Sequence, residues 1–342
     1  MAHAAAAVRA LISPTVVLGG TGFIGSHLVE RLAGRGDVTV VARRGTWPWG
    51  DLPRRVQVVS LDLARNAVQY ALDEILSHAT TVVNLTGMLA RPRVPAHEYV
   101  RLHVDATHRI TDALAHAKTE ISRLIHVSTT GVLGPTGDEP RDEESPPRPA
   151  TPYERTKLEG ETLALASRRP HREVVIVRPG LVYGPRDLHL VSWFRAIAQG
   201  TYRPIAAGRA VWQPIFVDDV VRGIEAAIKV KGADGQTFHL AGAERVTVAA
   251  LADRIGKALG TRTQRASLPL PLAMAAGTLL EAAFRPFGAD PPLSRARVKT
   301  MTESRVYSIA RAESLLGFRP SVPLDTGLRA TVAWYRDRRL LS

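Results

Sequence analysis

The fold of this chain is decided by the stretch Val16-Val17-Leu18-Gly19-Gly20-Thr21-Gly22-Phe23-Ile24-Gly25. An apolar run leads directly into glycines spaced G-x-x-G-x-x-G, and an amphipathic segment, Ser26 to Ala33, follows them. This order predicts a strand, a tight turn and the start of a helix. The glycines permit a sharp turn and a close approach to a pyrophosphate, and the helix N-terminus offers free N–H groups to phosphate. Glycine-rich turns occur in other α/β proteins too, but the flanking strand and helix favour a dinucleotide-binding unit.

The end of the next predicted strand, Asp37 to Ala42, indicates which dinucleotide is preferred. NAD-selective proteins usually place an acidic residue there to bind the ribose hydroxyls. Here the strand ends in Ala42, and Arg43 and Arg44 follow it. Guanidinium groups suit a 2′-phosphate, because they form charge-assisted hydrogen bonds with it. We therefore favour NADP(H), with NAD(H) as the alternative if both arginines are only solvated surface residues.

Composition narrows the classes of function. With 342 residues and 45% hydrophobic content, the chain can fold as one large domain or two smaller ones. It has no cysteine, which excludes disulfides, thiolate metal sites and a cysteine nucleophile, and we expect no metal site. The net charge of +13 comes from arginines scattered along the whole chain, and no nucleic-acid-binding module is evident. We therefore expect no nucleic-acid partner.

Neither a targeting signal nor a membrane span is evident in the sequence. The segment Met1 to Arg9 is short and weakly apolar, and the first predicted strand begins soon after it. No run of about 18 uncharged apolar residues occurs, as a membrane-spanning helix requires. We therefore expect a cytoplasmic protein.

The first half of the chain alternates strands and helices, as a parallel, doubly wound sheet requires. Further strands are predicted at Val56 to Val59, Thr81 to Leu85 and Arg123 to Val127, with a helix from about Glu98 to Lys118. In such sheets, ligands lie beyond the carboxyl ends of the strands. Four polar side chains are predicted at these ends: Asp62, Asn84, Thr86 and Thr129.

The strongest chemical signal is the pair Tyr153 and Lys157. Their i, i+4 spacing places both side chains on one face of a helix. A nearby ammonium stabilises phenolate, so we expect Lys157 to lower the pKa of Tyr153 towards neutrality and allow it to exchange a proton with a substrate. The pair alone is common in helices by chance, but it gains weight beside the glycine motif and the strand-end hydroxyl of Thr129. A proline-rich loop, 135–152, lies between them and is expected beside the site.

In these features the chain resembles the extended short-chain dehydrogenases/reductases, over nearly its whole length. The resemblance also rests on three later motifs. They are Arg178-Pro179-Gly180-Leu181-Val182-Tyr183-Gly184-Pro185, Pro214-Ile215-Phe216-Val217-Asp218-Asp219-Val220 and Leu315-Leu316-Gly317-Phe318-Arg319-Pro320. The family includes sugar-nucleotide epimerases, dihydroflavonol reductases and 3β-hydroxysteroid dehydrogenases. Their fold would be an α/β Rossmann-type doubly wound parallel sheet with a smaller, mostly helical C-terminal substrate domain.

The resemblance also implies roles for individual residues. Tyr153 would be the general acid/base, Lys157 would bind the nicotinamide ribose and tune the tyrosine, and Thr129 would hydrogen-bond the reacting oxygen. Asp62 and Leu63 would contact the adenine. The full set of expected cofactor contacts is Gly19, Thr21, Gly22, Phe23, Ile24, Gly25, Arg43, Arg44, Asp62, Leu63, Leu85, Thr86, Gly87, Tyr153, Lys157 and Pro179. One departure is the family's V-N-x-x-G-T segment, which here reads Leu102-His103-Val104-Asp105-Ala106-Thr107 and puts a supporting contact in doubt.

Departures from the sugar-nucleotide branch suggest the substrate class. Trp212 stands where those enzymes commonly carry a diphosphate-binding arginine, and the later R-x-G-D motif is missing, although Arg297 or Arg305 could substitute. The 4,6-dehydratases place Asp-Glu after the site threonine, but here Thr130 and Gly131 follow it. Dehydration of a sugar nucleotide is therefore not expected.

The apolar segment 268–287 resembles the region that covers an apolar substrate in 3β-hydroxysteroid dehydrogenases, sometimes at a membrane. An ordinary buried helix is the alternative explanation. A diphosphate would lose its hydration without compensation against such a surface.

Our hypothesis is an NADP(H)-dependent oxidoreductase that interconverts a secondary alcohol and a ketone on an apolar, sterol-like or long-chain substrate. The alternatives are an NDP-sugar 4-epimerase and a non-catalytic nucleotide-binding accessory subunit of a respiratory complex. Thr130, Tyr183 and Trp212 are the expected substrate contacts. We further expect a cofactor domain of residues 1–180 and 214–240, a cap of residues 181–213 and 241–342, a homodimer, and peripheral contact with a membrane.

Overall fold

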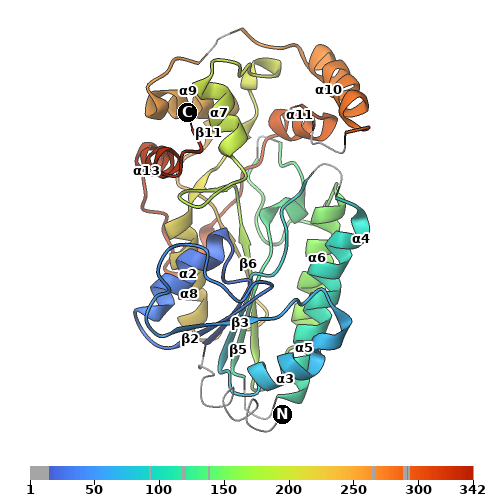
Figure 1. Cartoon of the computed structure of the whole chain (residues 1–342), viewed down its shortest axis with the longest axis vertical. Helices are drawn as coiled ribbons and strands as arrows, with labels where there is room; N and C mark the ends of the chain where they lie inside the picture. Colours follow the sequence, from blue (N-terminus) through green and yellow to red (C-terminus); the bar gives the residue numbers. More distant parts are fainter. Residues whose placement is uncertain are drawn as a thin grey trace.

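The computed structural model describes residues 15–91, 94–117, 121–137, 139–263, 266–287, 291 and 293–341. The expectation about a targeting signal at Met1 to Arg9 and the expected helix end at Lys118 lie outside the described residues. In Figure 1 a sheet flanked by helices forms the lower body, and a mostly helical cap lies above it.

The lower body is built on a sheet of seven parallel strands in the order β10-β6-β5-β4-β1-β2-β3. The strands are β1 (Thr15–Leu18), β2 (Val38–Ala42), β3 (Val56–Ser60), β4 (Thr81–Asn84), β5 (Arg123–Val127), β6 (Glu173–Pro179) and β10 (Thr237–Leu240). Central strands are buried on both faces, which explains their nearly continuous Val and Ile content. Because the sheet order reverses beside β1, the carboxyl ends of β1 and β4 border the crevice where such folds bind ligands. The predicted Rossmann-type sheet is confirmed.

Helices cover both faces of this sheet. Helices α2 and α8 pack together over one face, and α3, α5 and α6 cover the other. Their bounds are α2 (Phe23–Ala33), α3 (Gln69–Leu76), α5 (Ala106–His116), α6 (Pro152–Ala166) and α8 (Val217–Lys229), with a short 3-10 turn η1 (Asn66–Val68) before α3. The helix predicted from about Glu98 is divided into α4 (Ala96–Tyr99), a π-helical turn η2 (Val100–Asp105) and α5.

The cap has its own hydrophobic core, built around the aromatic rings of Trp193, Phe194, Trp212 and Tyr335. Its elements, with the connections that lead into it, are β7 (Val182–Tyr183), α7 (Val191–Ala198), η4 (Ala206–Gly208), β8 (Val211–Trp212), β9 (Ile215–Phe216), β11 (Val246–Thr247), α9 (Val248–Leu259), α10 (Leu270–Phe284), α11 (Arg295–Thr302) and α13 (Leu324–Asp337). Helix α12 (Ala310–Leu316) packs instead on α8 and β10 of the lower body.

Segment 214–240 is expected to belong with the main sheet, and only its second strand does so. Phe238 to Leu240 pairs with β6 in the main sheet, whereas Ile215 and Phe216 form a separate two-stranded parallel sheet with β7. In the sequence, the apolar run Ile215 to Val217 predicts a further strand of the main sheet, and this prediction is wrong. The position beyond β6 in the main sheet is occupied by β10, and the chain already enters α8 at Val217. The boundaries of the two domains stay a prediction.

The proline-rich loop is held against the C-terminal part of the chain. Backbone hydrogen bonds join Thr136 to Ser304 at 2.9 Å and Arg141 to Val306 at 3.1 Å. These hydrogen bonds hold segment 304–308 against the loop. Arg305 in this segment lies beside Glu154, in the first turn of α6.

Candidate active site

The glycine turn between β1 and α2 has no room for a side chain at Gly19 or Gly25. Gly19 has φ +77°, and a Cβ on it would lie 2.8 Å from the carbonyl oxygen of Leu85. A Cβ on Gly25 would lie 2.6 Å from the carbonyl oxygen of Gly19. Helix α2 starts after Gly22, and its first turn carries no acidic residue. The turn therefore offers open backbone N–H groups at a positive helix end, which fits the pyrophosphate of a dinucleotide.

Trp49, which sequence reasoning missed, covers this turn. Its indole Nε1 donates a hydrogen bond to the carbonyl oxygen of Thr21 at 2.9 Å. The guanidinium of Arg186 lies 5.4 Å from the centre of the Trp49 ring, and the ring of Trp334 in α13 lies 6.2 Å away. Trp49 thus links the glycine turn to the cap. It lies in a loop without periodicity, so only its aromatic character could have marked it.

The ends of β2 and β3 lie beside the turn. Ala42 is buried there, whereas Arg43 and Arg44 are exposed and form no ion pair with any residue that the structure describes. Asp62, after β3, accepts a hydrogen bond from the backbone N–H of Ala64 at 3.1 Å. Leu63 beside it is buried. These positions suit a phosphorylated ribose and an adenine, as the residue pattern predicts.

Helix α6 brings the catalytic candidates together. It begins with a capping box in which Thr151 accepts from the backbone N–H of Glu154 at 3.2 Å, and Glu154 accepts from that of Thr151 at 2.9 Å. This cap fixes the first turn, where Tyr153 hydrogen-bonds to Thr129 at the end of β5. One turn later, Lys157 Nζ donates to the carbonyl oxygen of Val127 at 3.0 Å. The structure therefore assembles all three residues at one strand end.

The pKa values in this cluster are set mainly by burial. Burial raises the pKa of Tyr153 to about 12, although its hydrogen bond with Thr129 works in the opposite direction. The expectation that Lys157 brings the pKa of this tyrosine towards neutrality is therefore wrong, since loss of solvent raises that pKa and only the hydrogen bond with Thr129 lowers it. Burial lowers the pKa of Lys157 to about 8, while the carboxylate of Glu161 raises it. At neutral pH the pair is a neutral phenol and a mainly protonated amine.

His103, in the π-helical turn η2, supports the cluster in a way that the sequence did not reveal. Its Nε2 accepts a hydrogen bond from the backbone N–H of Met88 at 3.2 Å, and Nδ1 lies 2.9 Å from Thr156 Oγ1. Because a backbone N–H can only donate, Nε2 is the acceptor and Nδ1 carries the proton. The imidazole ring also packs edge-on against Tyr153, with 5.5 Å between centroids.

This histidine stays neutral. Burial, followed by the positive charge of Lys157, lowers the pKa of His103 to about 2. It occupies the position at which the chain departs from the family's asparagine, and that departure was the one available signal. π-Helical turns within helices are frequent at functional sites. The turn here aims the imidazole at α6 and at the segment after β4.

The ends of β4 and β5 carry buried hydroxyls that suit a ligand. Thr86 Oγ1 and Ser128 Oγ are buried without a hydrogen-bond partner among the residues that the structure describes. Between them, a Cβ on Gly87 would lie 3.0 Å from His103 Nε2 and 3.3 Å from Lys157 Nζ. Leaving buried polar groups unpaired is costly, so a group that hydrogen-bonds them would be stabilised here. Together with the glycine turn, this arrangement fits a nicotinamide dinucleotide.

The remaining expected cofactor residues border the same crevice. Phe23 and Ile24 are half-buried at the start of α2 and pack against the cap core. Leu85 directly follows β4, and its backbone N–H donates to the carbonyl oxygen of Leu18 at 2.9 Å. Pro179 is buried at the end of β6.

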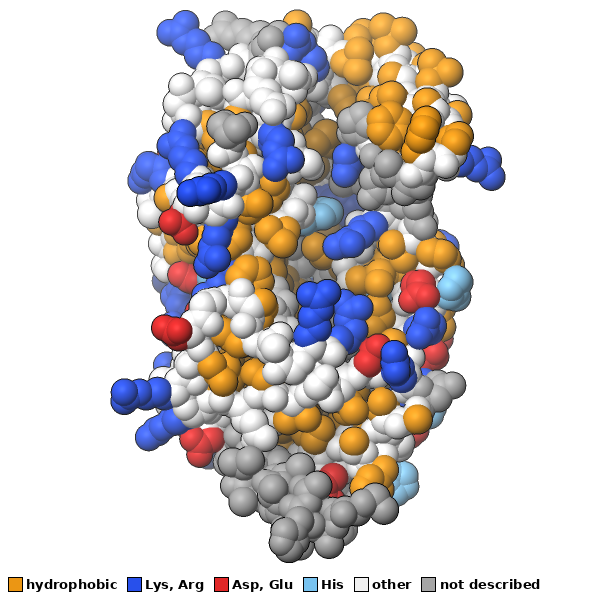
Figure 2. Space-filling view, in the orientation of Figure 1, with side chains coloured by type: hydrophobic (Ala, Val, Ile, Leu, Met, Phe, Trp, Pro, Cys, Tyr) orange, Lys and Arg blue, Asp and Glu red, His pale blue; other side chains and the backbone are white. Residues whose placement is uncertain are grey.

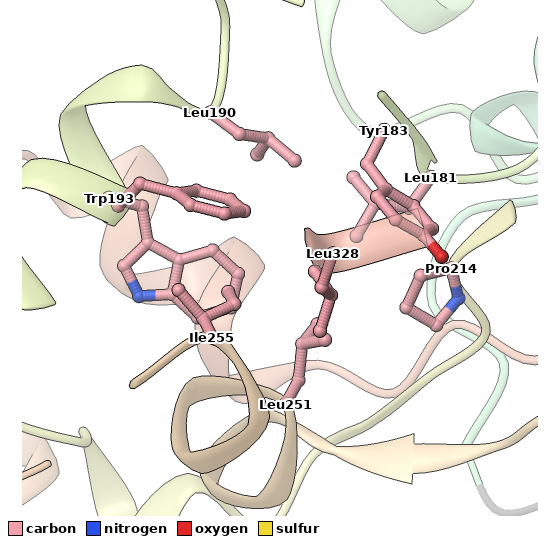
Figure 3. Close-up of a pocket in the computed structure, with 9 residues that line it drawn as sticks. Leu181, Tyr183, Leu190, Trp193, Pro214, Leu251, Ile255 and Leu328 are labelled. Atoms are coloured by element: carbon pink, nitrogen blue, oxygen red, sulfur yellow. The ribbon is translucent and has the colours of Figure 1, made fainter. Parts of the chain in front are cut away.

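The three expected substrate contacts are buried. Thr130 hydrogen-bonds to Tyr307 beside the site. The Tyr183 hydroxyl donates to the carbonyl oxygen of Leu324 at 3.3 Å, and the Trp212 indole Nε1 donates to that of Glu303 at 3.1 Å. Figure 3 shows Tyr183 facing an apolar cavity within the cap, between Leu181 and Leu328. The structure thus gives Tyr183 and Trp212 packing contacts in the cap, and a substrate role for either stays a prediction.

Basic side chains line the approach from the cap. Arg305 Nη1 lies 3.4 Å from Glu154 Oε1, which places this arginine beside the first turn of α6. Further out, burial and the positive charges of Arg297 and Arg91 lower the pKa of His189. Figure 2 shows a histidine and basic side chains at the hollow between the lower body and the cap. Arg91 and Arg297 therefore supply positive charge near His189, whereas Arg305 is paired with Glu154 and Glu303.

Two kinds of site were not found in the described part of the chain. No group of three or more His, Asp or Glu side chains is placed to hold a metal ion among the described residues. Within the same residues, no helix is both long and apolar enough to cross a membrane.

Comparison with known proteins identifies the family. The sequence pattern of the NAD dependent epimerase/dehydratase family matches residues 15–241. The chain is 29% identical to a dTDP-glucose 4,6-dehydratase of Streptomyces griseus, over 95% of this chain and 94% of that protein. It is 26% identical to a decarboxylating sterol-4-alpha-carboxylate 3-dehydrogenase of Saccharomyces cerevisiae, over 94% of this chain and 98% of that protein.

A solved structure agrees with these sequence relatives. MoeE5 in complex with UDP-glucuronic acid and NAD has a TM-score of 0.74 and 26% identity, covering 95% of this chain and 99% of that chain. The chain therefore belongs to the NAD dependent epimerase/dehydratase family and is an enzyme of the extended short-chain dehydrogenase/reductase type. Sterol and sugar-nucleotide relatives are about equally similar to it.

Proposed function

We propose that this enzyme is an NADP(H)-dependent oxidoreductase that interconverts a secondary alcohol and a ketone on an apolar, sterol-like or long-chain substrate. The observation that carries the reaction type is the assembly of Thr129, Tyr153 and Lys157 at the end of β5. In this cluster Tyr153 would be the proton donor, Thr129 the hydrogen-bonding hydroxyl and Lys157 the cation, beside the crevice that suits the cofactor.

In the reducing direction, Tyr153 acts as the general acid. Its pKa of about 12 keeps the phenol protonated at neutral pH, so it can donate a proton to the carbonyl oxygen as that oxygen gains charge. Thr129 Oγ1 accepts from the backbone N–H of Gly131 at 3.0 Å, and its O–H, which bonds Tyr153 in this structure, would turn to the substrate oxygen and polarise it. The Lys157 ammonium stabilises the phenolate that remains. The bound nicotinamide would supply the hydride, and the alcohol is oxidised by the reverse steps.

Cofactor preference is proposed from the end of β2. Arg43 and Arg44 are exposed and have no acidic partner among the described residues, while Ala42 cannot bind ribose hydroxyls. A 2′-phosphate would neutralise this positive charge. NADP(H) is therefore the favoured cofactor, although the named structural neighbour is a complex with NAD.

The proposed substrate polarity rests on Trp212. Its uncharged ring packs 5.8 Å from that of Trp193, and its N–H is bonded to a backbone carbonyl, so this position offers no charge to a diphosphate. An apolar substrate would gain about 25 cal/mol for each Å² that it buries. The sterol dehydrogenase among the relatives acts on a substrate of this class.

A second candidate, NDP-sugar 4-epimerase, is favoured by a different observation. Arg91 and Arg297 lie close enough to His189 to lower its pKa, so the approach to the site could attract a diphosphate. The third candidate, a non-catalytic accessory subunit, is opposed by the assembled Tyr153 and Lys157, which such a protein does not need.

Mass spectrometry of small molecules that copurify with the protein tests the proposal. A bound sterol or fatty ketone would support it, and a bound UDP-sugar would favour the epimerase. Tyr153→Phe protein should retain the same molecule, because the substitution removes only the phenol oxygen. A variant with altered cap residues should lose the bound molecule if the cap binds it. A variant with an altered exposed loop is the control and should retain the molecule.

A further inference from the structure

Helix α10 is apolar and exposed at the same time. Of its 15 residues, all of them described, only Ala273 and Gly277 are buried. Leu272 is 59% exposed and Leu279 is 71% exposed, and Phe287 just beyond the helix is 81% exposed. Figure 2 shows hydrophobic side chains gathered over the corner of the cap that α10 forms. A contiguous exposed patch of this kind marks a contact surface.

The packing of α10 explains why its large side chains face outward. A Cβ on Gly277 would lie 3.0 Å from the backbone nitrogen of Arg295, so α10 and α11 meet through small residues and backbone. Leu272 and Leu279 are seven residues apart, two helical turns, and lie on the opposite face. This segment is expected to be buried, either over a substrate or as an ordinary core helix. The exposure of α10 shows that it is not.

Basic residues outnumber acidic ones across α10, α11 and the described residues between them, taken together. Among the described residues from 266 to 303, the acidic side chains are Glu281, which accepts a hydrogen bond from the backbone N–H of Arg295 at 2.9 Å, and Glu303, which lies 3.8 Å from Lys299. The basic ones are Arg285, Arg295, Arg297 and Lys299. The whole chain carries a formal net charge of +13. The electrostatic complement of this surface is an anionic one.

The dimensions of α10 exclude a spanning role. At about 1.5 Å per residue the helix is roughly 22 Å long, shorter than the ~30 Å hydrocarbon core of a bilayer. A short apolar helix with basic neighbours lies in the plane of a membrane interface instead, with its apolar face among the acyl chains and its cations at the headgroups.

We propose that α10, together with the basic side chains of α11, docks this enzyme on the surface of an anionic lipid bilayer. An anionic bilayer fits this surface, because the surface combines large exposed apolar side chains with an excess of basic residues nearby. The proposal does not depend on the identity of the substrate.

The absence of cysteine in the chain allows a site-specific test. An environment-sensitive fluorophore is attached to Leu279→Cys, and to Tyr70→Cys as a matched control, since Tyr70 is 82% exposed on the lower body. Vesicles of pure phosphatidylcholine and of phosphatidylcholine with about 30% phosphatidylglycerol are then added. We expect a blue shift of the Leu279→Cys label with the anionic vesicles, weakened by salt, and none at Tyr70→Cys.

Sedimentation with the same vesicles gives an independent measurement. Leu279→Ser/Phe287→Ser should reduce the partition coefficient at least ~10-fold, while Tyr70→Ser/Leu315→Ser should leave it unchanged. Each of Arg295→Gln and Lys299→Gln should weaken binding by about fivefold, the effect of one basic residue near an anionic surface.

Two outcomes would overturn the proposal. One is an equal response of both labels, or no response of either. The other is a blue shift of the Leu279→Cys label without vesicles, rising with protein concentration as the mass doubles in analytical ultracentrifugation. That result would show that a second copy of the chain covers α10.

Discussion

Replacing His103 by phenylalanine tests whether this histidine positions Tyr153, the general acid that we propose. His103→Phe keeps a ring against Tyr153 but removes the acceptor for the Met88 N–H and the donor to Thr156. His108→Phe, on the neighbouring helix α5, is the matched control, because His108 is an exposed histidine. The comparison separates lost hydrogen bonds from a lost ring contact.

The expected loss of stability follows from the two hydrogen bonds. A buried or half-buried polar group that loses its partner costs about 1–3 kcal/mol. Thr156 Oγ1 keeps its hydrogen bond to the backbone, so most of the lost stability comes from the unpaired N–H of Met88. Urea unfolding should show His103→Phe destabilised by about 1–3 kcal/mol and His108→Phe by less than about 0.5 kcal/mol. Turnover should fall about 10- to 100-fold, because Gly87 and Met88 lose their anchor beside the reacting groups.

Acid unfolding adds a readout specific to the histidine. The pKa of folded His103 is about 2, below its usual value of 6.5, so below pH 6.5 the unfolded chain takes up a proton that the folded one does not. Stability therefore falls as the pH falls, and this histidine contributes about 1 kcal/mol per pH unit between roughly pH 5.5 and 4. His103→Phe should lose that part of the slope. Unchanged stability, slope and turnover together would refute the positioning role.

Three further predictions concern the catalytic pair and the cofactor. Tyr153→Phe should bind the cofactor nearly normally while turnover falls at least ~10²-fold, and activity within a few-fold of the parent would make the tyrosine structural. Arg43→Ala/Arg44→Ala should weaken NADPH binding at least ~10-fold and NADH binding little, with Arg54→Ala as the control; equal affinities of the parent for both cofactors would reject the NADP preference. Because the pKa of Lys157 is about 8, the ammonium is lost as the pH rises through that value, so kcat/KM of the parent should decline above pH 8 and Lys157→Met should abolish that decline. A decline that persists in Lys157→Met would assign it to another group.

Most of the sheet, and the clustering of Thr129, Tyr153 and Lys157, could be predicted from the sequence. Local patterns determine them: apolar runs buried on both faces, glycines where a Cβ would meet backbone, and Tyr153 and Lys157 one turn apart on a capped helix. Tertiary environment determined the rest. The pKa of Tyr153 depends on how much solvent the surrounding residues exclude, which spacing does not report.

The cap was predicted less well for a related reason. The apolar pattern of α10 indicates a helix but not which surface covers it, and exposure of Leu272 and Leu279 shows only in three dimensions. Likewise, Trp212 differs from the family pattern in sequence, yet its contact with Trp193 follows from the packing of α7 against β8. The π-helical turn that aims His103 has no reliable signal in sequence.

The central claim is net hydride transfer between the cofactor and an apolar carbonyl, and isotope transfer tests it most directly. The enzyme is incubated with NADPH deuterated at C4, separately for each face, together with a sterol ketone or with UDP-sugars, and the products are analysed by mass spectrometry. We expect one deuterium in the sterol alcohol, from one cofactor face only, and unchanged UDP-sugars. Epimerised UDP-sugar without deuterium, and no labelled sterol alcohol, would contradict it.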